Sequence, residues 1–183
     1  MRVTPMAIPD VLLIEPEVHR DARGFFLETF HAERYAAYGI TGPFVQDNHS
    51  RSVGGTVRGL HLQLARPQAK LIRVILGEIF DVAVDVRRGS PTFGQWVGET
   101  LSAESFRQYY IPEGFAHGFI ALQDDTHFLY KTTDFYDKAS ERCLRWNDPS
   151  LGIEWPTVDT ASGPGPVVND KDAHAPLLSQ AEI

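Results

Sequence analysis

The sequence predicts an all-β sandwich or barrel that folds as a single domain. Short β-prone runs recur along the chain and are separated by Gly, Pro, Asp and Ser, a pattern typical of antiparallel strands joined by turns. Only one segment has a helical composition, and many strands with one short helix indicate an all-β sandwich or barrel. The length of 183 residues suits one compact domain, and the 15 Gly and 12 Pro supply residues for many turns.

The expected strands follow one another from the N-terminus, and the expected helix comes early. Strands are predicted, in order, at residues 11–15, 24–30, 44–50, 56–63, 70–76, 78–86, 95–102, 106–111, 116–122, 126–133 and 142–146. The helix is predicted at residues 31–39 because good helix formers precede Gly39, a suitable C-terminal cap. We expect N-terminal strands within 1–43, a barrel core at about 44–146, and an extended wrap over 147–183, which contains five prolines.

The run at 78–86 indicates a polar side to the barrel interior. Period-2 alternation places Phe80, Val82 and Val84 on one face of this strand. Asp81 and Asp85 share the opposite face, so one side is expected to be packed and the other to tolerate charge. In a small barrel the second side can be a wet interior, and we therefore expect a polar cavity there.

Charge and composition exclude several classes of protein. The formal net charge is −7, so the chain gains nothing from the nonspecific attraction of a nucleic-acid backbone, and a DNA- or RNA-binding role is disfavoured. No apolar run approaches the roughly 20 residues needed to cross a bilayer, and the N-terminus lacks the features of an export signal. The only cysteine is Cys143, so no intrachain disulfide can form, which fits a reducing cytoplasm.

A metal site is the first hypothesis for the polar residues. Metal-binding cupins carry an HxH motif followed by a Glu, and later a PxGxxH motif. The second motif is present and ends at His117, but in the first part Gln63 replaces the second histidine after His61, and Lys70 stands where the Glu would be. An ammonium group cannot ligate a cation and would repel one. We therefore expect no metal, and a pocket suited to stabilising an anion.

Several motifs in a fixed order resemble one enzyme family. The runs RGLHLQ, PQAKLIRV, GEIFDVAVDVRRGSPTFGQW, IPEGFAHGF, FLYKTTDFY and WNDPSLGIEWP resemble the dTDP-4-dehydrorhamnose 3,5-epimerase family. The resemblance extends from DARGFF to NDKDAHAP, and the order and spacing of the motifs are more specific than any one of them. It implies a cupin-type jelly-roll barrel, usually a homodimer, that acts on a dTDP-sugar without a metal or organic cofactor.

The resemblance also implies a role for individual residues. His61 would be the proton acceptor and Tyr130 the proton donor on the opposite face of the sugar, with Lys70 stabilising the enolate. Asp172 would pair with His61 and raise its basicity. The expected substrate contacts are Arg23, Glu28, Gln46, Asp47, Asn48, Arg58, His117, Glu141 and Lys171.

The chemistry gives these roles a physical reason. Epimerisation beside a ketone removes a proton from one face and returns one to the other, through an intermediate with negative charge on the carbonyl oxygen. A histidine has a pKa suited to the base, and a phenol can donate a proton without carrying charge. A preplaced ammonium in a dry cavity stabilises the enolate, and loss of such a group costs about 3–4 kcal/mol of barrier. The negative charge of the substrate's diphosphate explains why an acidic protein would keep a local set of cations, namely Arg23, Arg58 and Lys171.

Some assignments have alternatives. Tyr136 competes with Tyr130 as donor. The tail departs from the family pattern before Lys171, so Asp170 is an alternative partner for His61, and Asp81 or Asp85 could also serve. Leu62 stands where relatives often carry an aromatic residue beside the base.

The spacing of Arg58 and His61 in the strand at 56–63 does not fit a regular strand with both side chains in one pocket. Arg58 and His61 are three residues apart, so a regular strand would place them on opposite faces. Gly59 could mark a bulge that redirects one of them, or Arg58 could reach another part of the nucleotide or the neighbouring subunit's site.

The expected function is isomerisation of dTDP-4-dehydro-6-deoxy-D-glucose at C3 and C5, which gives dTDP-4-dehydro-L-rhamnose. A related hypothesis keeps the fold but limits epimerisation to one carbon. Two hypotheses from other classes are a non-catalytic sugar-nucleotide-binding cupin and a metal-dependent cupin enzyme.

Overall fold

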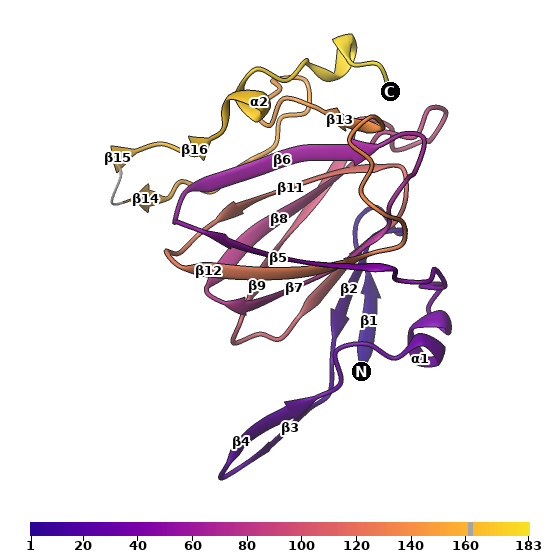
Figure 1. Ribbon diagram of the computed structural model, residues 1–183, viewed down its shortest axis with the longest axis vertical. Coiled ribbons are helices and arrows are strands. Elements are labelled where there is room, and N and C mark those ends of the chain that lie inside the picture. The colour runs from indigo at the N-terminus through magenta and orange to yellow at the C-terminus, as the bar shows by residue number, and fades with distance from the viewer. Residues whose placement is uncertain (161–162) are drawn as a thin grey trace.

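The computed structural model describes residues 1–160 and 163–183, and within them two antiparallel sheets face each other across an apolar core (Figure 1). The first sheet has the order β1 (Arg2–Pro5), β2 (Leu12–Glu15), β10 (Gln108–Ile111), β7 (Lys70–Leu76), β12 (Thr126–Thr132) and β5 (Gln46–Ser52). The second has the order β13 (Glu141–Cys143), β6 (Thr56–Gln63), β11 (Phe115–Ala121), β8 (Glu78–Asp85) and β9 (Trp96–Ser102), and β16 (Val167–Val168) pairs with β6 in parallel. The predicted all-β fold is confirmed.

The remaining elements lie outside these two sheets. They are the hairpin of β3 (Val18–Asp21) and β4 (Gly24–Leu27), the pair β14 (Asp159–Thr160) and β15 (Gly163–Pro164), the helices α1 (Ala32–Ala36) and α2 (Asp170–Ala173), and a 3₁₀ turn at Leu178–Gln180. None of the helices in the described residues has the length and apolar character that crossing a lipid bilayer requires.

Most expected strands were correct, and the differences have local causes. The strands at 56–63 and 70–76 have the predicted bounds. The run at 106–111 forms a strand only from Gln108, since Phe106 has a φ of +55°, outside the range of a strand. The run at 24–30 ends as a strand at Leu27, and the last strand is Glu141–Cys143 rather than 142–146.

The expected helix at 31–39 is shorter than predicted, but it ends as the glycine suggested. The helix α1 covers Ala32–Ala36. Beyond it, the N–H of Gly39 donates to the carbonyl of Ala36 and the N–H of Ile40 to that of Tyr35, with Gly39 at φ +83°. These two bonds form a Schellman-type C-terminal cap. Tyr35 is buried and its hydroxyl donates to Gln108 Oε1 at 2.8 Å, which fastens α1 to the first sheet.

The two faces of β8 are both buried, which corrects the expectation of a wet side. Val82 and Val84 pack outward beneath Leu144 and Leu151, while Ala83 packs into the core between the sheets. The two aspartates on the inner face have an exposed fraction of 0%. Each is paired within the protein, Asp85 with Arg87, Ser90 and Thr92, and Asp81 with His117. Burial of Asp85 is tolerated because both of its oxygens accept hydrogen bonds, whereas Asp81 accepts through Oδ2 alone and its pKa is raised by burial.

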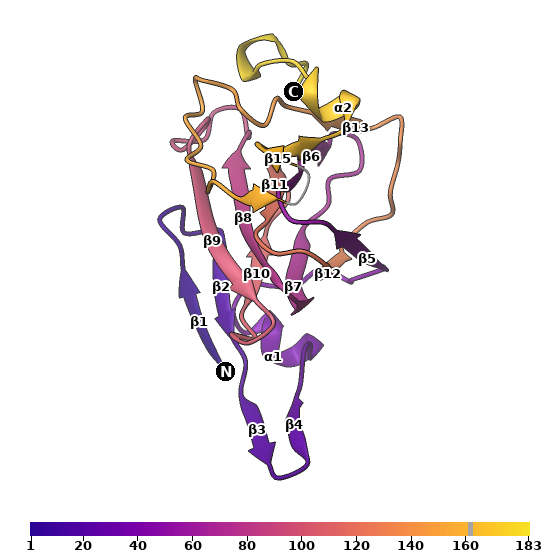
Figure 2. The same ribbon diagram turned by 90° about the vertical axis from the view of Figure 1, so that its left-hand side faces the viewer.

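Two segments complete the fold, one projecting from the sandwich and one packed on its outside. The β3–β4 hairpin extends from the body of the molecule as an arm, here called the N-terminal arm, residues 18–27 (Figure 1, Figure 2). The segment after β13 crosses the outside of the second sheet and carries α2, which lies beside β6 (Figure 1). The tail was predicted as an extended wrap with turns, so α2 was missed.

Candidate active site

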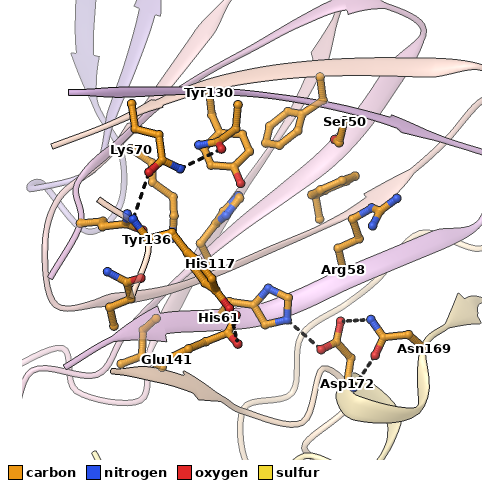
Figure 3. Close-up of a pocket in the computed structure, with 17 residues that line it drawn as sticks. Ser50, Arg58, His61, Lys70, His117, Tyr130, Tyr136, Glu141, Asn169 and Asp172 are labelled. Carbon is orange, nitrogen blue, oxygen red and sulfur yellow. Dashed lines mark hydrogen bonds and ion pairs between the residues drawn. The ribbon is translucent and has the colours of Figure 1, made fainter. Parts of the chain in front are cut away.

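A pocket of about 400 Å³ lies between the two sheets and receives side chains from both (Figure 3). The first sheet contributes Gln46, Asn48, Ser50, Lys70, Phe128 and Tyr130, and the second contributes Arg58, His61, Leu62, Gln63, His117, Phe119 and Glu141. The lining is completed by Gln68 and Tyr136 from loops and by Asn169 and Asp172 from the C-terminal segment. The prediction that β8 lines a polar cavity is therefore wrong, because the polar cavity lies along β5, β6, β7, β11 and β12 and receives no side chain from β8.

A bulge in β6 allows Arg58 and His61 to share this pocket. His61 is opposite His117 on β11, whereas Arg58 is opposite Phe119, so two β6 residues face the single residue Gly118. Gly59 in this bulge has a φ of +131°, and a Cβ there would lie 2.5 Å from the Cα of Gly118. Glycine is thus required by conformation and by the close approach of β11. The extra residue changes the alternation and explains why two residues three apart reach one cavity.

His61 is held by Asp172, the residue that the resemblance favoured. His61 Nε2 lies 2.7 Å from Asp172 Oδ1. The other carboxylate oxygen accepts from the backbone N–H of Gly59 at 3.1 Å and from Asn169 Nδ2 at 3.2 Å. Asn169 caps α2, and its Oδ1 accepts from the N–H of Asp172 at 2.8 Å. Asp172 has an exposed fraction of 0%, so these bonds fix the carboxylate.

This pairing excludes the alternatives for the partner of His61. Asp170 is exposed on α2, Asp81 bonds His117, and Asp85 bonds Arg87.

Electrostatics favours the protonated form of His61. Burial lowers the pKa of this imidazole, but the Asp172 carboxylate and the neighbouring Cys143 outweigh burial and raise the pKa to about 9. The same interaction lowers the pKa of Asp172 against the opposing effect of its burial. Because Nε2 is paired with Asp172, Nδ1 is the ring nitrogen that can take up a proton when the imidazole is neutral.

Lys70 carries its ammonium group into a nearly dry part of the pocket. Its exposed fraction is 8%, and burial lowers its pKa to about 8, although Asp81 and Glu141 oppose this change by their negative charge. His117 lies close by, bonded through Nε2 to Asp81 Oδ2 at 2.9 Å. Burial lowers the pKa of His117, which favours the neutral ring. Lys70 is therefore a cation in a low-dielectric site, where it can stabilise a nearby negative charge.

Tyr130 enters the pocket from the first sheet, opposite the strand that carries His61 (Figure 3). Its ring stacks on Phe128, with ring centroids 5.1 Å apart, which restricts its orientation. Burial raises the pKa of the phenol, and the positive charge of Arg58 opposes this effect. The phenol is thus protonated at neutral pH and able to donate.

Arg58 gives one part of the pocket a positive charge. Its guanidinium donates to Ser52 Oγ and to the backbone carbonyl of Arg51, both at 3.3 Å. These are neutral acceptors, so the charge of Arg58 remains available to an anionic ligand.

The rim of the pocket is formed by three linked side chains. Glu141 Oε2 accepts from Lys171 Nζ at 3.0 Å and from the Tyr136 hydroxyl at 3.4 Å. Lys171 does not line the pocket itself, and it reaches the pocket through Glu141.

The structure assembles most of the expected site residues, but three of them lie elsewhere in this chain. Arg23 is on the N-terminal arm and pairs with Asp21 at 2.6 Å, with 90% of its side chain exposed. Glu28 follows the arm and pairs with Arg34, and Asp47 is on the outer face of β5, paired with Lys131.

Sequence reasoning did not single out several pocket residues, which are Ser50, Gln68, Phe119, Phe128 and Asn169. Alternation along β5, through Gln46 and Asn48, could have indicated Ser50. Asn169 was also detectable, because an Asn three residues before an acidic residue is typical of a helix N-terminus.

Within residues 1–160 and 163–183, His61, Cys143 and Asp172 have the donor types of a metal site. The ligand atoms of His61, Cys143 and Asp172 lie within 4.8 Å of one another. Two ligands of one tetrahedral zinc ion are about 3.3 Å apart, from metal–ligand bonds of about 2.0 Å. The distance of 2.7 Å between His61 Nε2 and Asp172 Oδ1 is shorter than this ligand–ligand distance and is that of a hydrogen bond. His61 and Asp172 are therefore arranged to share a proton.

Comparisons with known proteins identify the family of this chain. The family model described as dTDP-4-dehydrorhamnose 3,5-epimerase matches residues 5–180. A dTDP-4-dehydrorhamnose 3,5-epimerase of Pseudomonas aeruginosa is 54% identical over 183 residues, covering 100% of this chain and 98% of the relative, and one of Shigella flexneri is 50% identical over 184 residues, with the same coverage. The crystal structure of the Legionella pneumophila dTDP-6-deoxy-D-glucose-3,5-epimerase in complex with dTDP-4-keto-L-rhamnose is similar with a TM-score of 0.92 and 49% identity, covering 98% of this chain and 93% of that one.

Proposed function

The chain belongs to the dTDP-4-dehydrorhamnose 3,5-epimerase family, and we propose that its pocket epimerises C3 and C5 of dTDP-4-dehydro-6-deoxy-D-glucose to give dTDP-4-dehydro-L-rhamnose. One observation carries this proposal. The His61 imidazole, paired with Asp172, and the Tyr130 phenol enter a single pocket from opposite sheets, beside the ammonium of Lys70.

The first step is proton abstraction by His61. Nδ1 of the neutral imidazole takes the proton from the carbon next to the C4 ketone, and the electron pair of the broken C–H bond moves to the carbonyl oxygen. The Asp172 carboxylate stabilises the imidazolium that forms and holds Nε2–H in place. Lys70 stabilises the negative charge on the oxygen, where low solvent access makes its ammonium effective.

The second step returns a proton to the other face of the same carbon. Tyr130 donates its phenolic proton as the enolate electron pair re-forms a C–H bond, leaving a phenolate that solvent reprotonates. The position of Tyr130 on the first sheet, with His61 on the second, supports delivery from the opposite side. Once the His61 imidazolium has released its proton to solvent, the same two steps act at the second carbon, so that both C3 and C5 are epimerised.

Binding of the nucleotide diphosphate is assigned to Arg58. The two hydrogen bonds of its guanidinium described above are to neutral acceptors. Arg58 also lies in the same pocket as the acid Tyr130 and the base His61. Arg binds phosphate oxygens through its planar fork of donors.

Deuterium exchange tests the proposal. When enzyme and substrate are incubated in D₂O, we expect NMR to show deuterium at both C3 and C5. The His61→Ala and Tyr130→Phe variants should lose or alter turnover, while calorimetry should show that their affinity for dTDP is kept. Exchange at one carbon would limit the activity to a single position. No exchange at either carbon would refute the proposed reaction.

We also propose that the working form is a homodimer in which the N-terminal arm enters the partner's pocket. The arm projects from the body, and its Phe25 and Phe26 are 55% and 70% exposed, an apolar surface that favours coverage by another chain. Arg23 and Glu28, expected from the resemblance to contact substrate, are outside this chain's pocket, which is consistent with service in a second copy.

A complementation experiment tests the exchange of arms. Dimers of Arg23→Ala chains would lack the Arg23 guanidinium in both sites, and dimers of His61→Ala chains would lack the base in both sites. In a mixed dimer the pocket of the Arg23→Ala chain meets an intact arm, so co-expression should restore about a quarter of wild-type activity. No recovery in proven mixed dimers would rule out a contribution of Arg23 across the interface.

A further inference from the structure

The loop between β12 and β13 carries Tyr136 to the rim of the pocket, where its hydroxyl contacts Glu141 (Figure 3). The backbone of this loop, residues 134–137, is bonded by side-chain amides from elsewhere in the site. Gln68 Nε2 donates to the carbonyl of Asp134 at 2.7 Å, and Gln46 Oε1 accepts from the N–H of Tyr136 at 3.0 Å. The position of Tyr136 is therefore determined by side chains that are distant in sequence.

Gln63 is the most fully engaged of these amides. Its Oε1 accepts from the N–H of Asp137 at 2.7 Å, and its Nε2 donates to the carbonyl of Phe135 at 3.2 Å. These two bonds are to the residues on either side of Tyr136. Nε2 also donates to the carbonyl of Arg66 at 2.6 Å, which ties the loop after β6 to the same side chain.

These bonds leave Gln63 little capacity to bind a ligand. A glutamine amide has two N–H donors, and both are used by carbonyls within the protein. The residue is only 8% exposed. Gln63 borders the pocket, but its polar atoms face the loop.

The chemistry of the amide suits this position better than that of other side chains. One oxygen must accept while one nitrogen donates twice, which only a primary amide of this length provides. A glutamate would place an acceptor against two carbonyls. Gln63 also follows His61 by two residues on β6, so the loop is fastened to the strand that carries the base.

We propose that Gln63 is a positioning residue that fixes the Tyr136 loop, and through Tyr136 and Glu141 the rim that places the sugar beside His61. The role rests on the epimerase function proposed above. Gln63 does not contact the substrate, and it acts on the sugar half of the ligand rather than on the nucleotide.

The test compares Gln63→Met with Gln123→Met, a matched change at an exposed residue of the turn between β11 and β12. Methionine keeps the length of the side chain but makes none of the three bonds. We expect kcat/KM for the dTDP-sugar to fall by at least about tenfold in Gln63→Met, from the loss of buried hydrogen bonds, and the Kd for dTDP alone to change by less than about twofold. Gln123→Met should match the wild type.

A double-mutant cycle with Tyr136→Ala tests whether the effect passes through the loop. If Gln63 acts by holding Tyr136, the effect of Gln63→Met should shrink to below about threefold in the Tyr136→Ala background, because interacting residues are non-additive. Equal effects in both backgrounds, or a wild-type kcat/KM in Gln63→Met, would overturn the proposal. Active wild-type enzyme in the same assay separates this outcome from failure of the epimerase function.

A second variant keeps the proposal testable if Gln63→Met does not fold. In Gln63→Glu the ionised carboxylate can accept from Asp137 but repels the carbonyls of Phe135 and Arg66, whereas the protonated form regains one donor. Its activity relative to wild type should therefore rise as the pH falls. A ratio that stays constant or decreases would contradict the role assigned to the amide donors.

Discussion

Replacing Asp172 by Asn removes the charge beside His61 while keeping the shape of the side chain. The surrounding donors dictate how the new amide must lie. Gly59 N–H and Asn169 Nδ2 both donate to Asp172 Oδ2, so the Asn oxygen must occupy that position. The amide nitrogen then takes the place of Asp172 Oδ1, which lies 2.7 Å from His61 Nε2 in the wild type. His61 must accept this hydrogen bond and carry its own proton on Nδ1, the atom that should receive the substrate's proton.

The magnitude follows from two effects. Loss of a charge-assisted hydrogen bond from a fully buried carboxylate costs about 1.5–3 kcal/mol, or roughly 10- to 150-fold in rate. The unsuitable tautomer disables the base as well, and a positioned base contributes about 10²- to 10⁴-fold. We therefore expect kcat to fall by about 10²- to 10⁴-fold.

The assay is steady-state turnover of the dTDP-sugar, combined with calorimetric binding of dTDP and a thermal melt. Asp170→Asn is the matched control, because Asp170 lies on the same helix, is exposed and was the rival partner in the sequence. We expect the control to keep wild-type turnover and both variants to bind dTDP normally. A kcat for Asp172→Asn within a factor of about two of wild type would refute the assignment of His61 and Asp172 as the base and its partner.

Three further predictions concern the same site and its scaffold. The kcat/KM profile should be bell-shaped, because catalysis needs a neutral His61, whose pKa is about 9, together with a charged Lys70, whose pKa is about 8. Both requirements are best met between these two pKa values, so activity should fall at lower pH as His61 is protonated and at higher pH as Lys70 loses its proton; a flat profile from pH 6 to 10 would contradict this. Lys70→Met should lower kcat by about 10²- to 10³-fold with unchanged dTDP affinity by calorimetry, and a fall in affinity alone would assign Lys70 to binding. Gly59→Ala should lower the melting temperature clearly, because its Cβ would lie 2.5 Å from the Cα of Gly118 at a φ of +131°, whereas Gly89→Ala, with nothing within 4 Å of the added Cβ, should cost only the strain of its φ of +84°.

The strands that form the sandwich were predictable because they are long and strongly β-prone. Thr56–Gln63 and Lys70–Leu76 were located to the residue. Short elements were not, since Arg2–Pro5 and Val18–Asp21 have four residues each and little hydrophobic alternation. The helix α2 is equally short and has no periodic pattern, although its Asn169 cap was a readable signal.

The pocket was predictable in its polar residues and not in its geometry. The motifs around His61, Lys70 and Tyr130 identified side chains that the fold brings into one cavity. Strand alternation alone placed Arg58 and His61 on opposite faces, and only the pairing with β11 shows the bulge that reunites them. The positions of Arg23 and Glu28 also depend on tertiary structure, because a hairpin that leaves the body of its own chain has no signature in local sequence.

The pairing of His61 with Asp172 has a consequence for the biosynthesis of the protein itself. The two residues are 111 positions apart, and Asp172 comes from the segment that packs on the outside of the second sheet. On the ribosome, the strand bearing His61 emerges long before α2. A nascent chain can thus form strands β1 to β13 while the imidazole still lacks its carboxylate, and His61 gains the partner that raises its pKa only when the late-synthesised segment docks.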